Sequence, residues 1–167
     1  RWLLQAAQES PADEELRAEL ERLGEELQNW EELVDLYRAN RGPLAEQPEA
    51  LVALDLRLGR ALAEELRETS EAMQAFCRVL DLSPDNTEAL YALETLYKRT
   101  AAWDELLATL TRLFELVDDP AERRRVLMDR ALVEEEQLGD VARAAATYRT
   151  VLSESPEDLE VLGNLRL

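Results

Sequence analysis

The prolines of this chain recur at a nearly constant spacing. Five of the six prolines, Pro11, Pro48, Pro84, Pro120 and Pro156, follow one another at intervals of 37, 36, 36 and 36. A fixed period of roughly 20 to 50 residues indicates a repeat architecture, in which each repeat is one supersecondary unit packed on its neighbours. Because proline cannot donate to a helical ladder and disfavours helical geometry in the preceding residue, we expect each proline to separate two helices.

Each block between two prolines divides into two amphipathic stretches. In the third block the apolar residues recur at helical spacing, first as Leu90, Leu93, Leu96 and Tyr97, then as Leu106, Leu107, Leu110, Leu113 and Leu116. Such stripes predict two helices with one buried face each, separated by the joint Thr100-Ala101-Ala102. In the fourth block, Gly139 is expected to take the left-handed conformation just past a helix end. No stretch alternates with period two over a useful length, so we expect no sheet.

A motif of a small residue, an aromatic residue four positions later and a proline twelve positions after the small one occurs twice. It comprises Ala72, Phe76 and Pro84 in the second block, and Ala144, Tyr148 and Pro156 in the fourth. This pattern resembles the tetratricopeptide repeat family. The resemblance implies an all-α solenoid, a right-handed superhelix of antiparallel helical hairpins. On the first helix of each hairpin the family has a small residue; Gly59 and Ala131 take that place, whereas the third block has Glu94 there.

A second period, about twice as long, runs above the first. Trp30-Glu31-Glu32-Leu33 matches Trp103-Asp104-Glu105-Leu106 two blocks later, and Val79-Leu80 likewise matches Val151-Leu152. Odd blocks carry the tryptophan and even blocks carry the small–aromatic motif, so duplication of a two-repeat unit is the simplest explanation. Trp30 and Trp103 are expected to pack within or between repeats; the alternative is that they anchor an interface, where tryptophan is enriched.

The periods predict one repeat array over residues 1–167. We expect the tail of a preceding repeat at 1–11, four full repeats at 12–48, 49–84, 85–120 and 121–156, and the first helix of a further repeat at 157–167. Terminal repeats need polar caps, and Val161, Leu162 and Leu165 do not form one. We therefore expect the chain to be part of a longer array.

The charge of the chain restricts its partners. Thirty-seven acids against nineteen bases give a formal net charge of −18 and a pI of about 4.4. This charge repels a phosphate backbone and an anionic membrane, so a protein or peptide partner that is basic or neutral fits better than nucleic acid. No stretch approaches the ~20 apolar residues of a membrane span. No secretion signal is visible and Cys77 is the only cysteine, which favours the reducing cytoplasm.

The residues needed for common catalytic chemistry are scarce. The chain has no histidine, so neither a neutral-pH proton shuttle nor a Cys/His metal cluster is expected. The run Glu134-Glu135-Glu136 is interpreted as a solvated helix surface, and Cys77 as a small, partly buried packing residue. We therefore expect no enzyme activity and no cofactor.

The resemblance also implies where a partner binds, because first helices line the concave face in tetratricopeptide arrays. Carried over by repeat position, the candidate groove residues are Arg22, Arg60, Tyr91, Thr95, Lys98 and Met128. The basic members of this set would suit an acidic segment or a C-terminal carboxylate. The alternative is that these are ordinary solvated positions.

These observations predict a protein–protein interaction scaffold or adaptor of a bacterial type. Its mechanism is shape, because a rigid concave helical surface offers contact area without chemistry. One alternative is a structural module that self-assembles through its terminal helices. A second alternative is a segment that regulates or positions an enzyme elsewhere in a longer polypeptide.

Overall fold

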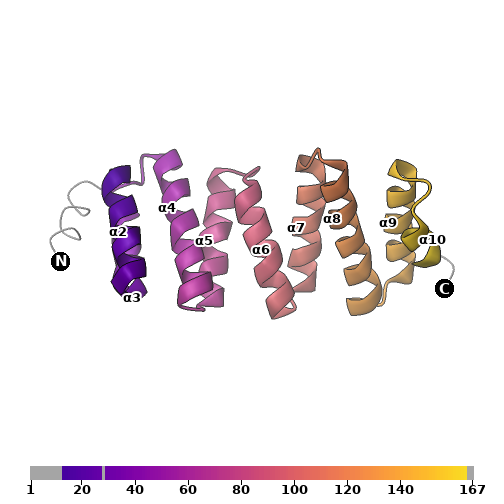
Figure 1. The fold of residues 1–167 in the computed structure, drawn as a ribbon, viewed down its shortest axis with the longest axis horizontal. Helices are drawn as coiled ribbons and strands as arrows, with labels where there is room; N and C mark the ends of the chain where they lie inside the picture. Colours follow the sequence, from indigo (N-terminus) through magenta and orange to yellow (C-terminus); the bar gives the residue numbers. More distant parts are fainter. Residues whose placement is uncertain (1–12, 28, 165–167) are drawn as a thin grey trace. The chain divides into compact units, whose positions relative to one another are not determined.

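The computed structural model describes residues 13–27 and 29–164, and these residues form helices and no strand (Figure 1). The expected helix tail at 1–11, including Pro11, lies outside the described residues. The helical segments in chain order are α2 (Glu14–Leu27), α3 (Trp30–Asn40), α4 (Pro48–Arg60), η1 (Ala61–Glu65), α5 (Thr69–Leu82), α6 (Thr87–Thr100), α7 (Trp103–Leu116), α8 (Pro120–Leu132), η2 (Val133–Gln137), α9 (Val141–Glu154) and α10 (Leu159–Asn164). The prediction of an all-α helical-hairpin repeat fold is confirmed.

The chain divides into two compact units, residues 1–89 and 90–167, and α6 crosses the boundary. In the first unit α3 packs against α2, α4 and η1, and α4 packs against α5. In the second unit α8 packs against α7, α9 and η2, and α10 packs against α9. None of the helices in residues 13–27 and 29–164 combines the length and the apolarity that crossing a membrane requires.

The prolines alternate between two structural roles. Pro48 and Pro120 occupy the first turn of α4 and α8. Asp119 caps α8, since its side chain accepts a hydrogen bond from the Glu122 amide at 2.9 Å. Pro84 and Pro156 instead lie in turns that precede α6 and α10. These four prolines therefore each separate two helices, as expected, but they do so from two different positions.

The caps that follow Pro84 and Pro156 come from later residues in each turn. The Ala89 amide donates to the Asn86 side chain at 2.9 Å, and the Val161 amide donates to the Asp158 carboxylate at 3.2 Å. Asn86 and Asp158 occupy equivalent places two blocks apart, just as Pro48 and Pro120 do. The local geometry thus repeats with the longer of the two sequence periods.

The small–aromatic motif lies in the core of each unit. Phe76 is 1% exposed, and its ring lies so close to the Gly59 backbone that a Cβ at residue 59 would meet the ring atom Cζ at 2.7 Å. Ala72, which precedes Phe76 by one helical turn, is also buried. In the second unit Ala131, Ala144 and Tyr148 form a core cluster with Leu127, Met128, Val151 and Val161. The small residue on the first helix therefore makes room for the ring on the second.

The first helices of the even blocks end differently from α6. Both α4 and α8 continue into π-helical segments, η1 and η2, which occupy equivalent places in the second and fourth blocks. A residue with positive φ follows each of them, Arg67 with φ 59° and Gly139 with φ 67°, and Ala101 takes φ 55° in the joint between α6 and α7. The left-handed Gly139 was predicted; the same conformation at Arg67 and Ala101 was missed because neither residue type favours it.

Glycine at either missed position is expected to stabilise the chain. The left-handed conformation costs a residue with a Cβ about 1–2 kcal/mol of folded-state free energy, which a glycine does not pay. Glycine also makes the unfolded chain more flexible, and this cancels about 0.4–1 kcal/mol of the benefit. Arg67→Gly and Ala101→Gly should therefore each raise the free energy of unfolding by about 1 kcal/mol, measured by urea denaturation. The matched control is Gly139→Ala, which should lower it by a similar amount; a loss of stability in both glycine variants would contradict the argument.

Candidate functional site

The basic residues predicted to bind a partner are engaged within the chain. The Arg22 guanidinium donates to Glu19 at 2.6 Å and also pairs with Glu26, both on its own helix α2. Arg60, at the end of α4, pairs with Glu88 in the first turn of α6. Lys98 lies 2.7 Å from both Glu94 and Asp129. Acidic side chains of the chain therefore already pair with the three positive charges to which an acidic ligand would bind.

Lys98 belongs to a charge network that links α6 to α8 in the second unit. The carboxylate of Glu94 is 7% exposed and accepts from Arg125 Nη1 at 2.8 Å as well as from Lys98. Arg125 also pairs with Glu122 and Asp129, and its guanidinium stands 5.8 Å from the centre of the Tyr91 ring. In the third block Glu94 stands where the family has a small residue. Its buried carboxylate is tolerated there because it is ion-paired with Lys98 and Arg125.

Opposing effects act on the ionisation of the residues in this network. Burial alone would raise the pKa of Glu94, but the hydrogen bonds from Arg125 and Lys98 outweigh it and hold the pKa below its usual value. Burial likewise disfavours the charged form of Lys98, yet the hydrogen bonds to Asp129 and Glu94 raise its pKa. The pKa of Tyr91 is raised by desolvation and by its contact with Glu122. Glu94 and Lys98 are therefore both charged at neutral pH, whereas the Tyr91 hydroxyl stays protonated.

The network predicts a pH dependence of stability. Because the folded pKa of Glu94 is lowered, its contribution is complete above the unfolded pKa and is lost as the pH falls through the folded value. We expect the free energy of unfolding to fall between about pH 5 and pH 3, and Glu94→Gln to flatten that fall. Glu105→Gln, an exposed site on α7, is the control. Equal slopes in both variants, in denaturation series across this range, would contradict the assignment.

The remaining predicted groove residues are divided between surface and core. Thr95 is exposed, and its hydroxyl donates to the Tyr91 carbonyl at 3.1 Å. Tyr91 is half-buried. Met128 is 7% exposed and belongs to the core cluster of the second unit, so it offers little surface to a partner. Met128 lies on the buried face of α8 together with Leu127 and Ala131 rather than on an exposed one.

Among the side chains that the structure describes, two acidic ones are 0% exposed, and one of them corrects a prediction. Glu134 was expected on a solvated surface, but it is 0% exposed. Its carboxylate accepts from Thr147 Oγ1 at 2.6 Å and from Arg130 Nε at 3.0 Å, and Arg143 lies 3.4 Å away. Glu136, by contrast, is exposed as expected. The run therefore contains a structural ion-pair centre that ties η2 to α9.

The second buried acid is Asp55 on α4. It is 0% exposed and lies 3.0 Å from both Arg41, just after α3, and Arg78 on α5. One carboxylate thus holds α3, α4 and α5 of the first unit together. Cys77, next to Phe76 and Arg78 on α5, is exposed rather than partly buried, because it lies away from the helix face that buries Phe76.

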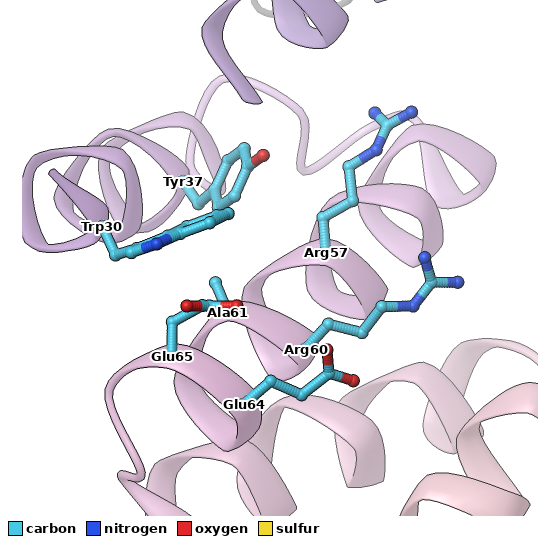
Figure 2. Close-up of a pocket in the computed structure, with 7 residues that line it drawn as sticks. All are labelled: Trp30, Tyr37, Arg57, Arg60, Ala61, Glu64 and Glu65. Atoms are coloured by element: carbon cyan, nitrogen blue, oxygen red, sulfur yellow. The ribbon is translucent and has the colours of Figure 1, made fainter. Parts of the chain in front are cut away.

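A pocket opens between α3, α4 and η1 in the first unit (Figure 2). Its volume is about 360 Å³, against about 240 and 190 Å³ for two hollows elsewhere in the described residues. Its walls are formed by Trp30, Tyr37, Arg57, Arg60, Ala61, Glu64 and Glu65. The sequence had singled out Trp30 and Arg60, but it gave no sign that they share a pocket.

Trp30 has two environments. The side chain is half-buried and packs on α2, because its ring atoms Cε3 and Cζ3 lie 4.0 Å from where a Cβ on Gly24 would stand. It also lines the pocket with Tyr37, which is 1% exposed. Trp30 is therefore both a packing residue and a surface on which a ligand could rest. No group of His, Cys, Asp or Glu in the described residues could hold a metal ion.

Comparison with known families identifies the repeats. Two models described as "Tetratricopeptide repeat" match adjacent segments, residues 89–124 and 125–158. Residues 89–158 form tetratricopeptide-like repeats. The two matches cover most of α6, all of α7 to α9 and the turn after α9, and they include the block in which Glu94 replaces the small residue. No curated protein sequence matches the chain.

Solved structures share the fold of this tetratricopeptide-like chain at low sequence identity. A crystal structure of MamA protein aligns with a TM-score of 0.60 and 15% identity, over 90% of this chain and 77% of that one. A crystal structure of YrrB, described as "a TPR protein with an unusual peptide-binding site", aligns with a TM-score of 0.51 and 14% identity. The alignment covers 100% of this chain and 99% of the YrrB chain. Tetratricopeptide repeats are generally protein-interaction modules without catalytic activity.

Proposed function

We propose that this tetratricopeptide-like chain is a scaffold or adaptor that holds a protein or peptide partner at the pocket of the first unit. The observation that carries the proposal is the pocket itself, because it places a half-buried tryptophan beside charged groups on helices that are fixed by a buried ion-pair centre at Asp55. Tryptophan is enriched among residues that dominate binding energy. The peptide-binding site named for YrrB supports a peptide ligand for the same fold.

The partner that fits best is basic or neutral. The chain carries a formal charge of −18, and Arg22, Arg60 and Lys98 are all paired with acids of the chain. An acidic ligand would have to displace those acids, whereas a basic ligand would meet carboxylates that are still exposed. Exposed Thr95 and Lys98 on α6 remain proposed contacts of the second unit. The single cysteine is compatible with the cytoplasm, which we propose as the location.

Site-specific photo-crosslinking tests this function in cells. A photoreactive phenylalanine analogue is placed at Glu68, which is exposed just after η1 but does not line the pocket. The matched control carries it at exposed Cys77 on α5. We expect a discrete crosslinked protein from position 68 and none, or a weaker product, from position 77. Equal products from both positions, or none from position 68, would overturn the proposal.

Self-assembly is a second candidate function, and one observation favours it. Leu159, at the start of α10, is 82% exposed, more than the other exposed large apolar side chains of the described residues, which are Leu82, Leu132, Leu138 and Val141. If α10 mediates association, light scattering should show a mass that rises with concentration for the parent chain and stays constant for Leu159→Glu. A constant monomer mass of the parent chain would exclude this function.

A further inference from the structure

The pocket of the first unit combines an aromatic surface with two carboxylates. Trp30 and Tyr37 project from α3, and Glu64 and Glu65 come from η1 (Figure 2). We propose that this pocket takes one cationic side chain of a partner, an arginine or a lysine, against Trp30 and between these carboxylates. The proposal rests on the proposed function and names the chemistry that the pocket recognises. Tryptophan offers the best aromatic face for a cation, and carboxylates accept its charge-assisted hydrogen bonds.

The two carboxylates are available to a ligand. Glu64 and Glu65 are both exposed, and no ion pair in the described part of the chain engages either of them. This sets them apart from the acids of the charge networks, such as Asp55, Glu88 and Glu94, which hold arginines or lysines of the chain. A partner cation would therefore form new ion pairs without breaking any that hold the fold.

The arginines of the pocket do not favour an anionic ligand instead. Figure 2 shows the guanidinium groups of Arg57 and Arg60 on the side of the pocket away from Trp30. Arg60 pairs with Glu88, and Arg57 also interacts within the chain. A partner carboxylate would compete with Glu88 for Arg60, and Glu64 and Glu65 would repel it. Charge complementarity therefore selects a cation.

The corresponding residues of the second unit lack this combination. Two blocks along the chain, Glu64 corresponds to Glu136, Glu65 to Gln137, Trp30 to Trp103 and Tyr37 to Leu110. The second unit thus retains the π-helical segment and the tryptophan but has one carboxylate fewer and no tyrosine. The acidic aromatic pocket is not a general consequence of the repeat, and Glu136 supplies a natural control.

A peptide titration tests the assignment directly. The probe is a fluorescein-labelled Gly-Ser peptide with three evenly spaced arginines, and its uncharged counterpart has citrulline at the same positions. Binding to the full chain is followed by fluorescence polarisation at physiological salt. We expect the arginine peptide to bind at least 10-fold more tightly than the citrulline peptide. Glu64→Gln with Glu65→Gln should weaken arginine-peptide binding at least 10-fold, and Trp30→Leu should weaken it several-fold.

The controls separate a built pocket from the general negative field of the chain. Glu115→Gln with Glu136→Gln removes the same charge from exposed sites of the second unit and should change the affinity less than 2-fold. Trp30→Phe keeps the packing on Gly24 and should retain most of the binding, while thermal melts report whether each variant is folded. Equal weakening by both glutamine pairs, equal binding of the two peptides, or no binding of the arginine peptide would overturn the proposal. In that case the crosslinking experiment is repeated with the Glu64→Gln, Glu65→Gln chain. If position 68 still crosslinks to the same partner, the scaffold function holds although the pocket does not recognise a cation.

Discussion

Phe76→Ala is expected to lower the free energy of unfolding by about 3–5 kcal/mol, the range found for buried aromatic residues. The ring is 1% exposed and rests on the backbone of Gly59, which has no side chain that could move into the space left behind. Tyr148→Ala in the second unit should have a comparable effect, since Tyr148 is 2% exposed. Urea denaturation measures both. Cys77→Ala, at the exposed neighbouring position, is the control and should cost less than about 0.5 kcal/mol.

The contact between Gly59 and Phe76 can be isolated by a double-mutant cycle. Alanine at residue 59 gains about 0.5–1 kcal/mol of helix stability over glycine, but its Cβ would stand 2.7 Å from Phe76 Cζ, and overpacking of this kind costs about 1–3 kcal/mol. Gly59→Ala should therefore destabilise the parent chain. In the Phe76→Ala background the clash is gone, and the same change should stabilise it. A Gly59→Ala effect of the same sign in both backgrounds would show that the ring does not lie on residue 59.

Replacing Arg41 and Arg78 with methionine together should cost about 3–5 kcal/mol, because the double change leaves the Asp55 carboxylate buried without a counter-charge. Each single change leaves one arginine 3.0 Å from Asp55 and should cost much less, so the double effect should exceed the sum of the single ones. The measurement is again the free energy of unfolding, compared across the parent, the two single variants and the double variant.

A third substitution distinguishes an unpaired buried charge from lost packing. Asp55→Leu added to the double variant removes the charge itself, and apolar replacements of whole buried ion-pair groups are often neutral. The triple variant should therefore recover most of the stability that the double variant loses. If it remains as unstable as the double variant, the arginine side chains contribute mainly by packing rather than by neutralising Asp55.

The sequence predicted the helices and their joints because those features depend on local chemistry. Apolar spacing in α6 and α7, the proline at the start of α8 and the glycine after η2 all act within a few residues. The core positions of Phe76 and Tyr148 also followed from the motif, since a ring four residues after a small side chain faces the same side of a helix. Local rules were sufficient for these elements.

The buried acids and the candidate site could not be predicted in this way. Glu134 looks like its neighbours in an acidic run, and its burial is tolerated because Arg130 on α8 and Thr147 and Arg143 on α9 satisfy its carboxylate. The same is true of Glu94, whose partner Arg125 comes from a different helix, α8. The pocket depends on η1, because Ala61, Glu64 and Glu65 of its lining belong to that π-helical segment. These features arise from pairs of helices rather than from any one segment.

The alternation of the helix starts restricts how such a chain can change in length during evolution. Pro48 and Pro120 stand at equivalent points, each in the first turn of a helix that continues into a π-helical segment. Loss of the segment 48–119 would join Gln47 directly to Pro120 and recreate a junction that the chain already uses. Loss of a single block would instead bring together two kinds of helix start that do not correspond. One kind has a proline in its first turn, as α4 does, and the other is capped by a later residue of the preceding turn, as α6 is by Asn86. Recombination that keeps every junction native would therefore add or remove hairpins in twos.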